Sequence, residues 1–260
     1  MGILFTAMLV LTFPQGIIHH GEETVSSSEM ISMLQEVPVV FIGEKHDDAL
    51  AHEWELYIWR NLASDERCLA LEMFETDVQG LLDSYLSGDL SLDELLESAR
   101  PWSNYIEDYH PMVEYAAQNG YNVIAANVPR HFASAVARRG WEGLRETEGS
   151  EFFESIIVDS TSVFYRQQFL ATMEALSGQM QSMPMDPVNM YRAQLLKDAV
   201  MASSIEGISC VFVCGSFHSD FHSGIPDQLE SGVLYLTVSV VGEDESWEAD
   251  QADFVIVREM

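Results

Sequence analysis

Short apolar runs alternate along the chain with longer segments in which apolar residues recur at helical spacing. Runs of this kind, a few residues long and bounded by turn residues, are typical of strands that are buried on both faces of a sheet. Buried strands that alternate with helices predict an α/β fold with a mostly parallel central sheet flanked by helices. The strand candidates are Val37–Ile42, Cys68–Leu71, Tyr121–Ala126, Ile208–Cys214, Val233–Val241 and Phe254–Val257.

The intervals between these runs carry helix signals. Ser26-Ser-Ser28 provides capping residues for a short helix that ends near Gln35, and Asp47 or Asp48 can cap the next helix. That second helix has an apolar stripe, and the aromatic residues around His52 fit a core better than a cofactor site. Further helices are expected over 77–99 and over 112–118, the latter with Asn119-Gly120 as its stop signal. Residues 131–206 are a predicted helical insertion with a break at Ser182–Pro187. The stripe consists of Leu50, Trp54, Ile58 and Leu62.

Four of the predicted strands are followed by polar residues at their carboxyl ends. In open α/β sheets ligands bind beyond this end of the strands, so the sequence predicts a polar site along one rim. Two of the turns share the form Gly-x-x-His, at Gly43–His46 and at Gly215–His218. The polar residues in question are Glu44 and His46, Glu72, Asn127 and Arg130, and His218.

The chemistry of this rim has two interpretations. Glu44, His46, Glu72 and His218 suit a divalent metal, or an acid/base pair for hydrolysis. The sequence has no HExxH, no GxGxxG, no Walker A motif and no GxSxG, which argues against zincins, dinucleotide or nucleotide cradles and serine hydrolases. A cleft of this kind can alternatively hold haem, with Tyr or His on the iron and Arg or His at the propionates.

Asp198 lies on an apolar helical face together with Tyr191 and Leu195. An acid in such a place is either a site residue or the partner of a neighbouring cation, Arg192 or Lys197. Both interpretations are consistent with the sequence.

The charge balance is strongly negative, with 42 Asp and Glu against 12 Lys and Arg and a formal net charge of −30. Such a surface repels phosphates and anionic lipids, so we expect neither nucleic acid nor a membrane surface as a partner. The acids are spread along the chain, which leads to the hypothesis of a high-salt host. Cys68, Cys210 and Cys214 fit no zinc spacing and are predicted to be core residues without disulfides.

The apolar run Ile3–Phe13 is too short to span a bilayer. It has the length of a signal-peptide core, but no Lys or Arg precedes it and no A-x-A site or lipoprotein cysteine follows it. An edge strand and a degenerate signal peptide both remain open for residues 1–20.

Six motifs resemble those of the ChaN-like haem-binding proteins, which are grouped with the Tiki and erythromycin-esterase-type proteins. They extend from about Val37 to Leu229 in the family's order. The resemblance implies one ChaN-like α/β domain over residues 1–260 that binds haem, forms a homodimer, serves iron acquisition and is exported or membrane-associated. It also implies kinship with metal-dependent hydrolases. The motifs are GEKHDD, LEMF, Trp102…Tyr109-x-Pro111, AANVPR, QLLKDAVMA and GSFH…GIP.

Carried over by motif, the family's polar cluster falls on Glu44, His46, Glu72, Asp198 and His218, and Asn127 and Arg130 line it. The family also implies a tyrosine that ligates the haem iron, for which Tyr109 is the candidate. One motif departs from the family pattern, because a single His52 stands where paired histidines are usual. We therefore expect a haem-binding uptake protein, with a metal-dependent hydrolase of ester or peptide bonds as the alternative.

Overall fold

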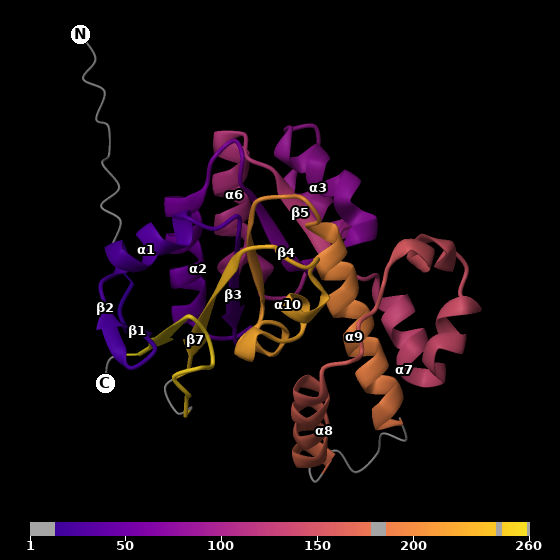
Figure 1. Ribbon diagram of the computed structural model, residues 1–260. Helices are drawn as coiled ribbons and strands as arrows, with labels where there is room; N and C mark the ends of the chain where they lie inside the picture. Colours follow the sequence, from indigo (N-terminus) through magenta and orange to yellow (C-terminus); the bar gives the residue numbers. More distant parts are fainter. Residues whose placement is uncertain (1–13, 178–185, 243–245, 259–260) are drawn as a thin grey trace.

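The structure is a computed structural model that describes residues 14–177, 186–242 and 246–258. The predicted apolar run Ile3–Phe13 and most of the predicted break at Ser182–Pro187 lie outside these residues. An eight-stranded sheet forms the centre, in the order β2-β1-β8-β7-β3-β6-β4-β5 (Figure 1). The strands are β1 Ile17–His20, β2 Glu23–Val25, β3 Val39–Glu44, β4 Cys68–Glu75, β5 Val123–Asn127, β6 Cys210–Gly215, β7 Tyr235–Val241 and β8 Phe254–Val257.

The sheet is mixed, with a parallel part that contains the candidate site. From β8 to β5 each strand runs parallel to its neighbours, whereas β1 is antiparallel to both β8 and β2. The predicted α/β fold with a mostly parallel sheet is confirmed. In register, Glu44 of β3 lies opposite Gly215 of β6, and Glu75 of β4 lies opposite Asn127 of β5. The carboxyl ends of these four strands therefore form one continuous rim.

Two strands extend beyond the apolar runs that predicted them. β3 continues past Ile42 to Glu44, and β4 continues past Leu71 to Glu75, with every residue of both strands buried. The predicted ends were wrong because Gly43 was taken to break the first run and the carboxylate of Glu72 to end the second. A buried carboxylate is tolerated inside a strand when it is hydrogen-bonded, and Glu44 and Glu72 both are.

Helices cover both faces of the sheet (Figure 1). On one face, apolar residues of the helices α1, α2, α3 and α6 form one core with the strands, including Met30, Trp54 and Met112. On the other face, α9 and α10 pack on the sheet through Met201 and Ile225. The helices are α1 Ser27–Gln35, α2 Ala49–Leu62, α3 Gln79–Leu86, α4 Leu92–Ser98, α5 Tyr105–Asp108, α6 His110–Asn119, α7 Arg130–Arg145, α8 Val163–Ser177, α9 Pro187–Ser204 and α10 Ile225–Gln228.

The predicted helix signals act at the expected places. Ser26 and Glu29 form a capping box on α1, Asp48 caps α2, and Gly120 ends α6 in the left-handed region at φ 75°. The helix expected over 77–99 is instead divided into α3 and α4. Gly88 lies between them at φ 81°, a conformation that a helix cannot contain.

The chain between β5 and β6 forms a helical layer at one side of the molecule (Figure 1). It contains α7, a 3₁₀ helix Ser150–Ser155, α8 and α9. α7 and α9 share an apolar cluster that includes Val136, Phe153 and Leu196. α9 belongs to two layers at once, because its last turns pack on the sheet while its first turns pack on α7 and α8.

The three cysteines are free and buried, as the sequence predicted. Cys210 and Cys214 lie on the same face of β6 in the core beneath α9. Within 14–177, 186–242 and 246–258, no helix combines the length and the hydropathy that a transmembrane span requires.

Candidate functional site

The two Gly-x-x-His turns lie side by side at the ends of β3 and β6, and each makes room for the other. A Cβ atom at Gly43 would lie 2.7 Å from Ser219 Oγ and 2.9 Å from Ser216 Cα, both in the second turn. A Cβ atom at Gly215 would lie 3.0 Å from Cε1 of His46, in the first turn. Neither glycine has a positive φ, so the requirement at both positions is space for a close approach. The repeated motif is therefore one interlocked structure.

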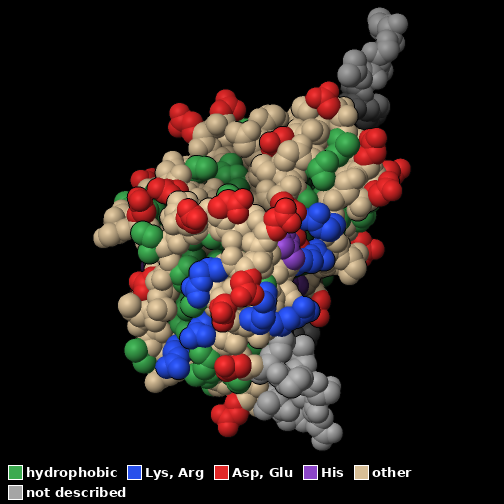
Figure 2. Space-filling view, turned by 90° about the vertical axis from the view of Figure 1, so that its right-hand side faces the viewer, with side chains coloured by type: hydrophobic (Ala, Val, Ile, Leu, Met, Phe, Trp, Pro, Cys, Tyr) green, Lys and Arg blue, Asp and Glu red, His purple; other side chains and the backbone are tan. Residues whose placement is uncertain are grey.

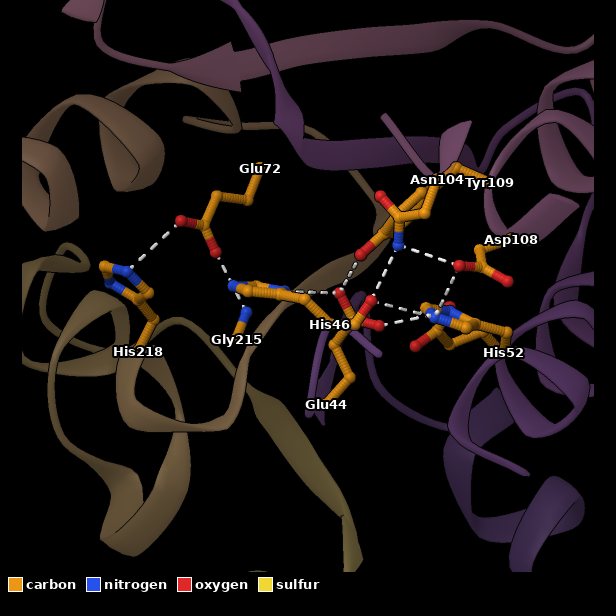
Figure 3. Close-up of polar contacts among 10 residues, drawn as sticks. Glu44, His46, His52, Glu72, Asn104, Asp108, Tyr109, Gly215 and His218 are labelled. Atoms are coloured by element: carbon orange, nitrogen blue, oxygen red, sulfur yellow. Dashed lines mark hydrogen bonds and ion pairs between the residues drawn. The ribbon is translucent and has the colours of Figure 1, made fainter. Parts of the chain in front are cut away.

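Glu44 is the centre of the first polar group. Its Oε1 accepts hydrogen bonds from the Tyr109 hydroxyl at 2.5 Å and from His46 Nδ1 at 2.8 Å (Figure 3). Its Oε2 lies 3.2 Å from His52 Nδ1. The side chain of Glu44 is 1% exposed, so these three partners replace the water that the carboxylate would otherwise bind.

Behind Glu44 lies a second buried carboxyl group, Glu55 of α2. His52 Nδ1 is 3.0 Å from Glu55 Oε2, and the Oε1 atom of Glu55 has no hydrogen-bond partner among the described residues. Burial and the neighbouring Glu44 charge raise the pKa of Glu55 well above its usual value. Two adjacent buried carboxylates therefore favour a proton, or a cation in its place, between Glu55 and Glu44.

Glu44, His52 and Glu55 also form a potential metal site. One ligand atom from each residue lies within 4.8 Å of the ligand atoms of the other two. Three side chains at this spacing can hold a metal ion. Two carboxylates and one imidazole suit Zn²⁺ or Mn²⁺. The sequence did not predict this metal-binding group, because His52 lies among aromatic residues that fit a core.

His46 differs from the other site residues because its side chain is 45% exposed. Trp102 contacts the ring edge-on, with 4.4 Å between the ring centroids. With Nδ1 bound to Glu44, Nε2 has no hydrogen-bond partner within the described part of the chain. A histidine whose Nδ1–H is held by a carboxylate is the common form of a metal-ligating histidine, because the carboxylate fixes the tautomer and the ring orientation.

His218 belongs to a second polar group, in which it is held between two carboxylates. Its Nδ1 is 2.5 Å from Asp198 Oδ1, and its Nε2 is 3.3 Å from Glu72 Oε1. Burial alone would lower the pKa of His218, but the two carboxylates outweigh it and raise the pKa to about 10. Burial likewise raises the pKa of Glu72, yet the charge of His218 more than compensates and holds it well below the usual range. His218 is thus an imidazolium at neutral pH.

Residues of the helical layer complete this second group. The Tyr165 hydroxyl donates to Asp198 Oδ2 at 2.7 Å, and the Gln194 amide lies 3.2 Å from the His218 ring. The Gly215 backbone N–H donates to Glu72 Oε2 at 2.9 Å. The partners of the Asp198 carboxylate are thus His218 and Tyr165, and among the described residues it forms no ion pair with Arg192 or Lys197.

Asn127 and Arg130 lie further along the same rim, at the end of β5. Arg130 forms an ion pair with Glu75, which also binds Arg100 at 3.1 Å. Asn127 is buried, and its Oδ1 atom has no hydrogen-bond partner among the described residues. These two residues therefore form a separate part of the rim, next to a carboxylate, Glu75, that the sequence analysis did not select.

Comparison with known proteins identifies the family. The model of the family described as "Haem-binding uptake, Tiki superfamily, ChaN" matches residues 30–229. The chain belongs to this family. The solved structure described as "Cofacial heme binding to ChaN of Campylobacter jejuni" superposes with a TM-score of 0.74 at 18% identity, covering 95% of this chain and 98% of that one. The fold of this chain is therefore the ChaN-like fold.

Two other similarities are more limited. The Arabidopsis thaliana protein RETICULATA-RELATED 5, chloroplastic, is 31% identical over 124 aligned residues, which cover 42% of this chain and 16% of that protein. This chain thus matches only a small part of the length of that curated relative. The structure of the type III effector HopBA1 gives a TM-score of 0.46 at 14% identity.

In this ChaN-family chain, the predicted ligand set is divided between the two polar groups. Glu44 and His46 lie in the first group with Tyr109, and Glu72 and His218 lie in the second with Asp198. His46 lies between the two groups in Figure 3, against Gly215. The sequence contains one signal for His52 and Glu55, which were not predicted as site residues. They are three positions apart on a helix and therefore share a face. Nothing in the sequence pointed to Tyr165 or Glu75.

Proposed function

We propose that this protein binds haem and serves haem or iron uptake, with the haem held at the carboxyl rim of the sheet. Membership of a haem-binding uptake family over residues 30–229 supports the ligand class. The observation that carries the proposal for this chain is His46, a half-exposed imidazole whose Nδ1 is held by Glu44 and whose Nε2 has no partner in the described ranges. Histidine and tyrosine are both common axial ligands of haem iron.

His46 fits the iron better than Tyr109, the candidate taken from the family. Tyr109 is 1% exposed, and its hydroxyl already donates to Glu44 at 2.5 Å. Burial and the Glu44 charge raise the pKa of Tyr109, which opposes the tyrosinate form that iron binds. In this proposal Tyr109 orients Glu44, Glu44 orients His46, and Trp102 offers an aromatic surface beside the ligand. Bound haem would supply the iron centre, and the protein would hold and release it.

Hemin titration of the purified chain tests this proposal. The wild type should give a shifted Soret band with saturable stoichiometry. His46→Ala should abolish the shift, Tyr109→Phe should weaken it, and His131→Ala, at an exposed histidine of α7, should leave it unchanged. A spectrum equal to that of free hemin, or equal effects of His46→Ala and His131→Ala, would contradict the proposal.

Assembly and compartment are extensions of the same proposal. We expect a homodimer and an exported or membrane-associated protein, on the basis of the family resemblance alone. Light scattering with and without hemin measures the mass in solution, and cell fractionation gives the compartment. A monomer under both conditions would exclude the dimer.

A divalent metal at Glu44, His52 and Glu55 is the second candidate. It is favoured by Glu55 Oε1, a buried oxygen without a hydrogen-bond partner among the described residues, and by Glu44 Oε2, whose contact there is the ion pair with His52 Nδ1 at 3.2 Å. A catalytic metal keeps a position open to substrate, whereas these three residues are at most 7% exposed. The arrangement therefore fits a structural ion better than the metal centre of an ester or peptide hydrolase.

Elemental analysis of the purified protein distinguishes a metal from a shared proton. A bound metal should appear at one equivalent and be lost in Glu55→Gln, which keeps the shape of the side chain. His218→Gln serves as the comparison outside this group. Metal-free protein that stays inert on ester and peptide panels with added Mn²⁺ or Zn²⁺ would exclude both the ion and the hydrolase.

The acidic surface supports a further part of the proposal, a high-salt host. With a net charge of −30, self-repulsion destabilises the compact state, and salt screens it within about 10 Å at 0.1 M. We expect the melting temperature to rise as KCl increases. A melting temperature that does not rise with salt would exclude this idea.

A further inference from the structure

A hollow of about 640 Å³ lies in the helical layer, and no residue of the Glu44 or His218 groups lines it. Residues of α7, α8, α9 and the chain from 153 to 160 line it. Its apolar wall includes Phe153, Leu195 and Leu196, which are all buried. The volume lies within the range of pockets that bind small molecules.

Three arginines also line the hollow: Arg145 of α7, Arg166 of α8 and Arg192 of α9. This is unusual in a chain with only 12 Lys and Arg and a net charge of −30. Figure 2 looks onto this side of the molecule and shows Lys and Arg side chains gathered there, with apolar and acidic side chains among them. The helical layer thus concentrates positive charge around an apolar wall.

The arginines of the hollow differ in their partners from four of the seven other arginines of the chain. Arg100, Arg130, Arg139 and Arg258 each form an ion pair with a carboxylate. By contrast, no Asp or Glu in the described ranges forms an ion pair with any of the three arginines of the hollow; Arg192 donates to the Asn189 side chain at 2.8 Å. In a strongly acidic protein, three guanidinium groups without acidic partners leave their charge available to an anion from outside.

A buried hydroxyl gives a second, independent indication of a ligand. Tyr191 of α9 lines the hollow, is 4% exposed, and has a hydroxyl group without a hydrogen-bond partner in the described part of the chain. An unpaired buried hydroxyl costs free energy, and a ligand oxygen in the hollow would satisfy it.

We propose that this hollow is a second binding site, for an apolar molecule that carries one or two carboxylates. The apolar wall would cover the body of the ligand, while the three arginines and the Tyr191 hydroxyl would donate to its carboxylate oxygens. A fatty acid and haem, with its propionates, share this chemistry. The proposal does not depend on haem binding at His46, because none of the lining residues belongs to the Glu44 group.

Calorimetric titration of the full chain with dodecanoate tests the proposal, with dodecanol as the neutral ligand of equal chain length. Dodecanoate should bind saturably and dodecanol at least about tenfold more weakly, since it lacks the charge that the arginines recognise. Arg166→Gln and Arg192→Gln should each weaken dodecanoate binding by about threefold to tenfold. Tyr191→Phe should weaken it by a smaller factor.

Arg138→Gln is the matched control, because Arg138 lies on α7, is exposed and does not line the hollow. It makes the same change in net charge and should leave binding within about twofold of the wild type. Melting curves followed by circular dichroism show whether each variant is folded; Arg166→Gln, at an exposed position, keeps the test available if Arg192→Gln is unstable. Absence of saturable dodecanoate binding, equal binding of dodecanol, or equal losses in Arg138→Gln and Arg166→Gln would overturn the proposal.

A competition arm separates the two sources of the ligand and the two sites. If hemin displaces dodecanoate, and still does so in His46→Ala, the hollow accepts haem itself. If dodecanoate binds while hemin does not compete, the hollow takes a fatty-acid-like ligand. Haem binding at His46 is then tested by the hemin titration alone. If dodecanoate does not bind but the Soret shift is intact, only the proposal of a binding site in the hollow is overturned. If dodecanoate binds but the Soret shift is absent, only the proposal of haem binding at His46 is overturned.

Discussion

The turns Gly43–His46 and Gly215–His218 have the same local form and end adjacent parallel strands, yet their histidines are in opposite chemical states. His46 is 45% exposed, binds one carboxylate and keeps one nitrogen unpaired. His218 is 7% exposed and lies between Asp198 and Glu72, which raise its pKa to about 10. An imidazolium has N–H groups on both nitrogens and no lone pair for a metal. The motif therefore positions a histidine, and the surrounding elements decide what it can do.

The cause of this difference is the cover above each turn. α9 packs over the second turn and brings Asp198 and Gln194 onto His218, while Tyr165 of α8 closes the other side of Asp198. Above the first turn, His46 has Trp102 at its ring edge, and nearly half of its side chain remains exposed. Haem or metal chemistry at this rim is accordingly expected at His46, and a structural role at His218.

The largest expected effect comes from breaking the buried pair at His218. Asp198→Asn removes a carboxylate from a buried imidazolium and should lower the free energy of unfolding by about 3–5 kcal/mol. His46→Ala, at the exposed turn, should cost less than about 1 kcal/mol, because a half-exposed ion pair contributes little. Urea unfolding of both variants provides the comparison. Similar losses in the two would show that the turns are not energetically different.

The second expected effect is a pH dependence that belongs to His218. Its folded pKa of about 10 lies above its usual value of 6.5, so its stabilising contribution is complete below pH 6.5 and is lost as pH rises towards 10. Between pH 6.5 and 8.5 this should lower the free energy of unfolding by roughly 2–3 kcal/mol. NMR titration of the His218 ring in the wild type and in Asp198→Asn measures the pKa itself.

Glu55 must be separated from this effect. Its folded pKa is raised, so it also makes stability fall with rising pH, but this loss starts near its usual value of 4.5. Glu55→Gln should therefore flatten the stability profile from pH 4.5 upward and leave the titration of His218 unchanged. A His218 ring that titrates near its usual pKa in the wild type would contradict an imidazolium held between Asp198 and Glu72.

The third comparison concerns the tyrosines that serve the two groups. Tyr109 donates to Glu44 at 2.5 Å and Tyr165 donates to Asp198 at 2.7 Å. Replacement of either by Phe should cost about 1.5–3 kcal/mol, as expected for a hydrogen bond to a buried charge. Hemin spectra should change in Tyr109→Phe alone. A change in Tyr165→Phe of the same size would place the ligand nearer to His218.

The smallest expected effects come from the two turn glycines. In Gly43→Ala the new methyl group would meet the backbone at Ser216, which cannot easily move, so we expect a loss of about 1–3 kcal/mol. In Gly215→Ala the methyl group would meet the His46 ring, which can swing outward, so the loss should be under about 1 kcal/mol. The Gly215 variant should nevertheless alter the hemin spectrum. A larger loss of stability in Gly215→Ala than in Gly43→Ala would mean that His46 is fixed in place.

Much of the fold could be predicted from the sequence, because its signals are local. The apolar runs located six of the eight strands, and Ser26, Asp48 and Gly120 marked helix ends that the structure confirms. The short strands β1 and β2, at one end of the sheet, were not predicted, since three or four residues carry little periodicity. The ends of β3 and β4 were predicted too early, at Ile42 and Leu71, whereas the strands end at Glu44 and Glu75. Burial of a carboxylate within a strand depends on partners that lie far away in the chain.

Part of the candidate site was equally accessible. The carboxyl-end rule selected Glu44, His46, Glu72 and His218, and the parallel register brings them to one rim. The sequence could not divide them into two groups, because the division depends on α9 and on the junction of α5 and α6 that carries Tyr109. His52 and Glu55 were not predicted as site residues, because a buried ion pair and a core position give the same pattern on a helix with a strong apolar stripe.

By itself, then, the sequence determined the α/β fold, the polar rim and the strongly acidic character, since these follow from periodicity, position along the strands and composition. Only the tertiary structure decided which histidine is free to bind a ligand and which is held as a cation. It also decided that three arginines from three helices meet at one hollow. The physical reason is the same in each case: protonation state and available ligand atoms depend on burial and on charges within a few ångströms, which the fold brings together from distant parts of the chain.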